Sequence, residues 1–153
     1  MNAFLLLQGI ETLSLRMDRH LLNTKQLLEY LDNHDQVSWV NHPDMPGHDS
    51  HGIAKKYMPK GAGSIITFGV KGGREAGKAF IENVKLASHL ANVGDAKTLI
   101  IHPATTTHSR IDAEALVAAG ITEDMIRISV GIEDVGDITQ DFNIGFRAAK
   151  KYI

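Results

Sequence analysis

The first 33 residues constrain the fold most, because their apolar side chains recur at three- and four-residue steps. Residues at this spacing lie on one broad face of an α-helix, so the pattern predicts a helix over 2–33. The residues of this face are Phe4, Leu7, Ile10, Leu13, Met17, Leu21, Leu28 and Leu31. Asn33-His34-Asp35 ends the pattern. We therefore expect the chain to begin with its longest element.

After this helix, short apolar segments alternate with helical segments. Strands are predicted at 37–40, 64–70, 86–89, 98–101 and 126–130, and helices at 50–58, 74–84, 112–119 and 134–151. The segment 41–50 contains Pro43, Pro46 and Gly47 and is expected to be a loop. At 153 residues the chain is one domain's worth of sequence. The pattern predicts an α/β (α+β) fold in which helices cover one side of a sheet.

Composition excludes several classes of partner. The formal net charge of −2 provides no basic surface for nucleic acid or membranes. No apolar run approaches the roughly 20 residues that cross a bilayer, and the apolar start Met1–Gln8 lacks the basic residues of a signal peptide. The chain has no cysteine, which excludes disulfides and fits a reducing compartment. We expect a cytoplasmic protein.

Arg127 is the residue that most strongly indicates a ligand. It lies in an apolar strand that leads into a helix, so a rigid element holds its guanidinium. The guanidinium presents a planar fork of donors that matches the two oxygens of a carboxylate. The alternative is a plain ion pair with Glu133, Asp134 or Glu123. Residue chemistry alone leaves both interpretations open.

Other motifs have simpler structural explanations. The segment Gly72–Ala79 nearly matches a phosphate-binding loop, but Ala79 lacks the hydroxyl that binds Mg²⁺, and we expect a strand-to-helix turn. Ser109 and His108 are adjacent, which does not create the geometry of a catalytic triad.

Histidines raise the question of a metal site. His42, His48 and His51 lie close together in sequence, with His102 and His108 further on. No acidic residue lies at a diagnostic spacing from them, and a zinc site needs three or four converging ligands. We expect histidines that are solvated or bonded locally, and no metal site.

Three long stretches together resemble a known family. They are Leu7–Met17, Ala91–Ser109 and Arg127–Asp134. They are similar to the C-terminal part of the Cys/Met-metabolism pyridoxal-phosphate (PLP) enzymes, and most similar to the O-acetylhomoserine sulfhydrylases. The resemblance runs along essentially the whole chain, in order.

The resemblance implies a fold and a set of site residues. It implies the small C-terminal domain of a fold type I PLP enzyme, with a mostly antiparallel sheet covered by helices on one side. Arg127 would clamp the α-carboxylate of the substrate, and the turn at Asn92 and Val93 would orient it and line the pocket. The Asn92 side chain, where relatives often have serine, favours the sulfhydrylase branch.

The resemblance also implies that the cofactor is attached elsewhere. The family's Schiff-base lysine lies upstream in a Ser-x-x-Lys type segment, and Lys97 has different neighbours. We therefore expect residues 1–153 to be a single substrate-side domain of a longer protein. In this interpretation Met1 lies part-way along that protein's sequence. Its helix over 1–33 would connect to the absent PLP-binding large domain.

The expected reaction of the parent enzyme converts O-acetylhomoserine and sulfide to homocysteine and acetate, in methionine and cysteine biosynthesis. We expect the domain alone to be inactive and to form a dimer or higher oligomer. The alternatives are a fragment of a cystathionine γ-synthase or methionine γ-lyase, a non-catalytic amino-acid-binding module that uses the same Arg127, and a purely structural interaction domain.

Overall fold

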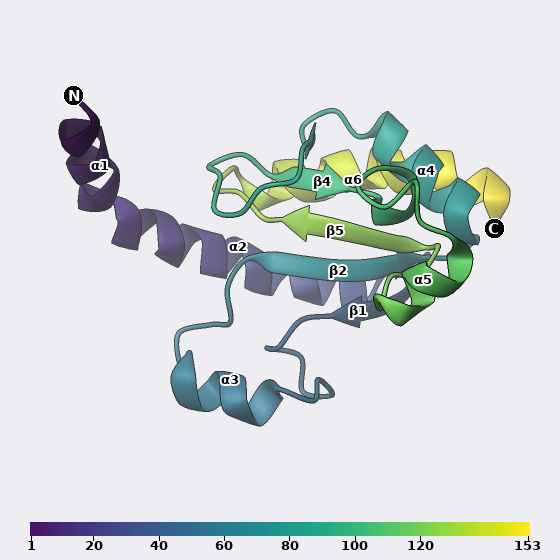
Figure 1. Cartoon of the computed structure of the whole chain (residues 1–153), viewed down its shortest axis with the longest axis horizontal. Helices are drawn as coiled ribbons and strands as arrows, with labels where there is room; N and C mark the ends of the chain where they lie inside the picture. The colour runs from purple at the N-terminus through teal and green to yellow at the C-terminus, as the bar shows by residue number, and fades with distance from the viewer.

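The structure is a computed structural model that describes residues 1–153, apart from the side chain of Ala113. Its elements are α1 (Asn2–Glu11), α2 (Leu13–Asp32), β1 (Val37–Asn41), α3 (His51–Tyr57), β2 (Ile65–Val70), α4 (Gly73–Asn83), β3 (Ser88–His89), β4 (Leu99–Ile101), the 3₁₀ helix η1 (Pro103–Thr105), α5 (Ala113–Ala118), β5 (Met125–Ser129), α6 (Val135–Ala149) and η2 (Lys150–Tyr152). Every strand and helix predicted after residue 33 is present, with ends shifted by one or two residues (Figure 1).

The predicted single helix over 2–33 is wrong, because the chain breaks at Thr12. Thr12 has φ −106° and ψ 6°, outside helical geometry, and separates α1 from α2. Gly9 and the β-branched Thr12 both disfavour a helix interior. The Arg16 guanidinium donates to the Gly9 carbonyl at 2.5 Å, which compensates part of the lost helical bonding. Periodicity alone contained no signal of this break.

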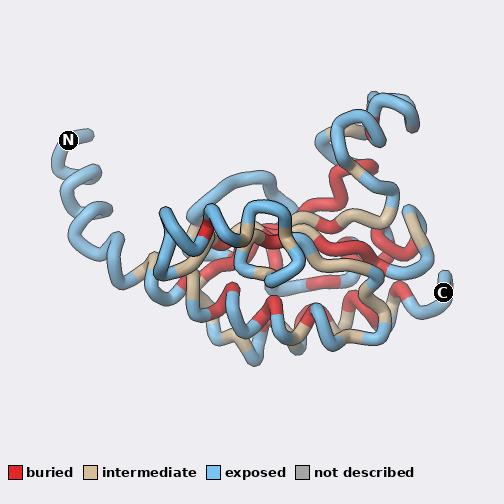
Figure 2. Tube along the Cα trace, turned by 90° about the horizontal axis from the view of Figure 1, so that it is seen from below, coloured by how far each residue is buried: buried red, intermediate tan, exposed pale blue. Residues whose placement is uncertain are grey.

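α1 does not pack into the core. None of its residues is buried, and it extends away from the rest of the molecule (Figures 1 and 2). The predicted apolar face is buried only toward its C-terminal end, at Leu28 and Leu31. The N-terminal part of that face, including Phe4 and Leu7, is exposed to solvent.

The strands form one five-stranded sheet in the order β1-β2-β5-β4-β3. The pairs β1–β2, β2–β5 and β4–β5 are antiparallel, and only β3–β4 is parallel. The prediction of a mostly antiparallel sheet is therefore confirmed. Among the described residues, no helix is both long and apolar enough to cross a membrane.

The core lies between one face of this sheet and α2, α4 and α6, as the alternation of strand side chains requires. Figure 2 shows the buried residues concentrated in the sheet and on the inward sides of the helices. The main contributors are Ile66, Phe68, Val70, Ile126 and Ile128 on the strands, and Leu27, Leu31, Phe80, Phe142 and Phe146 on the helices. The prediction that helices cover one side of the sheet is therefore confirmed.

The opposite face of the sheet carries the residues that alternate with this core. Arg127 lies on that face at the centre of the sheet, with Thr67 of β2 and Ile101 of β4 as its register partners. A central strand is held on both edges, so the backbone that carries Arg127 is rigid.

Candidate functional site

Arg127 lies on β5 with its side chain half-buried, directed away from the helix layer. Its Nη2 donates to the main-chain carbonyl of Asn92 at 3.5 Å, a contact across 35 residues of sequence. The structure thus brings together two of the residues that the sequence singled out. The remaining donors of the guanidinium stay available to a ligand, provided that no acidic residue of the chain occupies them.

The three acidic side chains considered as partners of Arg127 are bonded elsewhere. Glu123 forms an ion pair with Arg74 at 2.9 Å. Asp134 caps α6 by accepting from the Gly136 N–H at 2.8 Å, and Glu133 accepts from Thr98. In the part of the chain that the structure describes, Arg127 takes part in no ion pair. The plain ion-pair interpretation of Arg127 is therefore wrong for this structure.

Asn92 and Val93 form an exposed bend between β3 and β4. The Asn92 Oδ1 accepts from the Val93 N–H at 2.9 Å, a local bond that shapes the bend and leaves its carbonyl facing Arg127. Val93 is 64% exposed and so lies at the rim of the bend. With this geometry the bend can form one side of a binding site next to the Arg127 guanidinium. A ligand role for Asn92 and Val93 stays a prediction.

A buried polar network behind this bend was missed at the sequence level. Glu133 accepts from both the N–H and the hydroxyl of Thr98, at 2.7 and 2.9 Å. Glu133 lies in the turn that follows β5. On the other side of this turn, Asn23 of α2 donates to the carbonyls of Gly131 and Glu133. The only available signal was the presence of Glu133 within the stretch that contains Arg127, and a contact across 35 residues leaves no local pattern.

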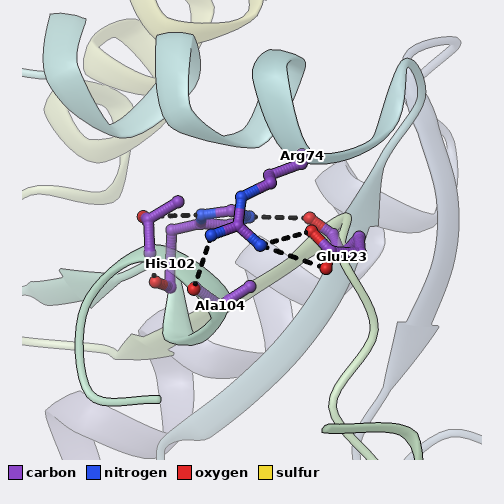
Figure 3. Close-up of polar contacts among 5 residues, drawn as sticks. Arg74, His102, Ala104 and Glu123 are labelled. Carbon is purple, nitrogen blue, oxygen red and sulfur yellow. Dashed lines mark hydrogen bonds and ion pairs between the residues drawn. The ribbon is translucent and has the colours of Figure 1, made fainter. Parts of the chain in front are cut away.

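His102 belongs to a second polar cluster at the other end of β5, drawn in Figure 3. Its Nε2–H donates to the Glu123 carbonyl at 2.8 Å, and its Nδ1 lies 2.8 Å from the Thr105 hydroxyl. Arg74 joins the same cluster by donating to the Ala104 carbonyl and the Glu123 carboxylate. His102 is fully buried, and the bonds of this cluster connect α4, η1 and the segment before β5.

The other histidines considered as metal ligands bond to nearby main-chain groups. The Nδ1 atoms of His42 and His48 accept from the N–H groups of Asp44 and Ser50, and the His51 Nδ1 lies 2.9 Å from the Pro43 carbonyl. His108 faces the Thr107 hydroxyl at 2.8 Å rather than Ser109. Within the described residues, no three His, Asp or Glu side chains converge as a metal ion requires.

Acid is expected to destabilise the fold through His102 and His42, both of which are buried. Burial lowers the pKa of His102 and of His42 below the ordinary value of 6.5. The unfolded chain therefore takes up these protons more readily, and stability is lost as the pH falls below about 6.5. Each such group contributes at most about 1.4 kcal/mol per pH unit.

Chemical denaturation between pH 7.5 and 5 tests this expectation. His102→Gln keeps a side-chain donor for the Glu123 carbonyl but does not titrate, so the variant should lose less stability on acidification than the wild type. His42→Gln should further reduce the dependence of the free energy of unfolding on pH. A pH dependence that neither substitution reduces would contradict the assignment to these histidines.

The segment Gly72–Ala79 is a strand-to-helix turn, as predicted. Gly72 precedes α4 in the left-handed conformation, with φ 98°. Gly77 lies against His102, where a Cβ atom would come within 2.8 Å of the Nε2, and Ala79 is buried. These two positions pack the helix onto its neighbours.

The lysines show whether the chain could hold a covalently bound cofactor. Every lysine, including Lys97 beside the Asn92 bend, is exposed to solvent. An amine that forms a Schiff base is usually activated by desolvation or by a neighbouring cation. The lysines that the structure describes do not have a buried environment, so they do not fit covalent attachment of such a group.

Comparison with known proteins gives a family match over residues 1–147, to the family described as Cys/Met metabolism PLP-dependent enzyme. The homocysteine synthase of Schizosaccharomyces pombe is 52% identical over 141 residues, which are 92% of this chain and 33% of that protein. The O-acetyl-L-homoserine sulfhydrylase 1 of Thermus thermophilus is 52% identical over 137 residues, which are 90% of this chain and 32% of that protein.

The fold is also similar to that of solved structures. The cystathionine gamma synthase of Xanthomonas oryzae pv. oryzae, in complex with cystathionine, has a TM-score of 0.88 and 35% identity. The similarity covers 99% of this chain and 39% of that chain. The chain spans about a third of the length of the curated relatives it matches.

Proposed function

This chain belongs to the Cys/Met metabolism PLP-dependent enzymes, and from that membership we propose that it is the substrate-side domain of an O-acetylhomoserine sulfhydrylase. In this proposal the complete protein, meaning this chain together with a PLP-binding region, converts O-acetylhomoserine and sulfide to homocysteine and acetate. The similarity to relatives named homocysteine synthase and O-acetyl-L-homoserine sulfhydrylase supports this branch of the family.

The observation that carries the proposal is the position of Arg127. Its guanidinium lies on a central strand beside the Asn92 carbonyl, and the acidic residues near it in sequence bond to other groups. A carboxylate that reaches this fork can accept two parallel charge-assisted hydrogen bonds. The amino-acid substrate would bring that carboxylate.

The contribution of this chain to the reaction is positioning. Arg127 would bind the α-carboxylate, and the bend at Asn92 and Val93 would form the adjacent wall. Binding the carboxylate end of the substrate holds its reacting carbons within the site, and this interaction is equally strong in the ground state and in the transition state. When bound, PLP supplies the electron sink. Because the lysines of this chain do not fit covalent attachment of PLP, the PLP-binding region belongs to another part of the complete protein.

α1 supports the proposal of a partner region. It exposes Phe4, Leu5, Leu6, Leu7 and Ile10, each by more than half of its surface. Contiguous apolar surface of this kind usually marks an interaction site. We infer that a PLP-binding large domain covers α1 in the complete protein, and that the chain alone self-associates through it.

Experiments on the chain alone separate this proposal from a stand-alone amino-acid-binding module. The proposal expects little heat on titration with homoserine, methionine or O-acetylhomoserine, because much of the pocket wall is contributed elsewhere. It also expects no borohydride-stable adduct with PLP. Saturable binding of a free amino acid would favour the module, and an adduct at one specific lysine would contradict the proposal.

A substrate comparison on the complete protein separates the branches of the family. The sulfhydrylase proposal expects highest activity with the acetyl ester of homoserine and sulfide. A preference for the succinyl ester and cysteine would favour a cystathionine γ-synthase, and elimination from methionine would favour a methionine γ-lyase.

A further inference from the structure

Glu133 connects the two segments that form the candidate site. It follows β5, the strand that carries Arg127, and both oxygens of its carboxylate bond to Thr98, which begins the chain's return into β4. Thr98 is fully buried. The Thr98 hydroxyl donates to Glu133 and at the same time accepts from the Gly131 N–H at 2.9 Å. One residue of the loop after the Asn92 bend is thus held at three points.

Two further contacts fix the same junction. The Ile132 N–H donates to the Ala96 carbonyl at 2.9 Å. A Cβ atom on Gly131 would lie 2.2 Å from a Glu133 carboxylate oxygen and 2.4 Å from the Thr98 nitrogen. This close approach leaves no room for a side chain at Gly131. The loop that contains Asn92 is therefore docked against the turn after β5 with little freedom.

α2 holds the other side of this turn. His20 is buried, and its Nδ1 lies 2.7 Å from the Val130 carbonyl, so this nitrogen must carry the proton. Asn23, also buried, donates to the carbonyls of Gly131 and Glu133 at 3.0 and 2.8 Å. Because α2 fixes the main chain of the turn, the Glu133 side chain starts from a fixed point and holds Thr98 in place.

We propose that Glu133 is a positioning residue that holds the Asn92 bend against Arg127 and so sets the affinity of the site for a carboxylate. This inference rests on the proposed function. Glu133 acts through Thr98 and the bend, and does not contact the substrate. Arg127 meets the bend at a single 3.5 Å contact, so a displaced bend would leave the guanidinium free to turn away from the ligand.

The test measures the preference for a carboxylate in the complete protein. Calorimetry gives the dissociation constants of homoserine and of aminopropanol, the amine that remains when homoserine loses its carboxyl group. Their ratio isolates the carboxylate contribution. Glu133→Gln replaces one of the two acceptor oxygens by an amide NH2 group, which cannot accept a hydrogen bond from Thr98, and is expected to reduce the preference for homoserine about tenfold.

Variants of Thr98 make the test independent of any folding defect of one protein. Thr98→Val removes the hydroxyl and is expected to reduce the preference as Glu133→Gln does, whereas Thr98→Ser keeps the hydroxyl and should retain it. The double variant Glu133→Gln/Thr98→Val should be no worse than either single one, because both remove the same connection. Glu123→Gln, which removes a carboxylate from the distant pair with Arg74, is the matched control and should leave the preference unchanged.

The outcomes distinguish this inference from the proposed function. If Arg127→Lys lowers the preference for homoserine while Glu133→Gln and Thr98→Val leave it intact, the role of Glu133 is overturned and the proposed function stands. If Arg127→Lys also leaves the preference intact, the proposed function fails. Equal weakening of homoserine and aminopropanol by Glu133→Gln would indicate a structural role only and would overturn the positioning role.

Discussion

Arg127→Lys in the complete protein is expected to raise the KM for O-acetylhomoserine about thirty-fold, while kcat changes little. Lysine keeps the positive charge but cannot form two parallel bonds to one carboxylate. Loss of one charge-assisted bond costs about 2 kcal/mol, which corresponds to this change in affinity. An interaction that is equally strong in the ground and transition states appears in KM rather than in kcat. Steady-state kinetics over a range of substrate concentrations measures both constants.

Arg74→Lys is the matched control for this experiment. Arg74 also binds a carboxylate, since its Nη1 donates to both oxygens of Glu123, but both side chains are more than 40% exposed. Exposed pairs contribute little, so the KM of this variant should stay within about twofold of the wild type. A KM unchanged by Arg127→Lys would remove Arg127 from the role of carboxylate clamp.

Phe80→Ala is expected to destabilise the chain by about 3–5 kcal/mol. Phe80 is fully buried and packs edge-on against Phe146 and Phe142, with ring centroids 4.7 and 5.6 Å away. Its removal leaves a cavity where α4 and α6 meet the sheet. A loss of this size is a large part of the stability of a typical domain. Urea denaturation followed by circular dichroism measures it.

Leu7→Ala provides the comparison on α1. Leu7 is also large and apolar, but it is 63% exposed, so at protein concentrations where the chain is monomeric its truncation should change the free energy of unfolding by less than about 0.5 kcal/mol. Equal losses for Phe80→Ala and Leu7→Ala would mean that α1 packs into the core, contrary to the structure.

The sequence predicted those parts of the fold whose signals are local. β2 begins with four β-branched or aromatic residues in a row, and α6 has Asp134 at its start and Lys150 near its end, as the helix dipole favours. The break at Thr12 was not predictable from periodicity, because the apolar spacing continues through it. The exposure of α1 was also hidden from periodicity, since an apolar face does not reveal whether its partner is present.

The candidate site divides in the same way. Residue chemistry singled out Arg127, but its proximity to Asn92 came from the family resemblance and not from any spacing. The contacts between Glu133 and Thr98 and between His20 and Val130 join segments 35 and 110 residues apart. Such contacts depend on how the sheet brings its strands together, and no local sequence pattern encodes them.

The most direct measurement of the central claim is a crystal structure of the complete protein with an unreactive amino acid bound. The account predicts that both carboxylate oxygens accept from the Arg127 guanidinium at about 2.8 Å, beside the Asn92 bend. A carboxylate held by other residues, with the Arg127 side chain turned into solvent, would contradict it.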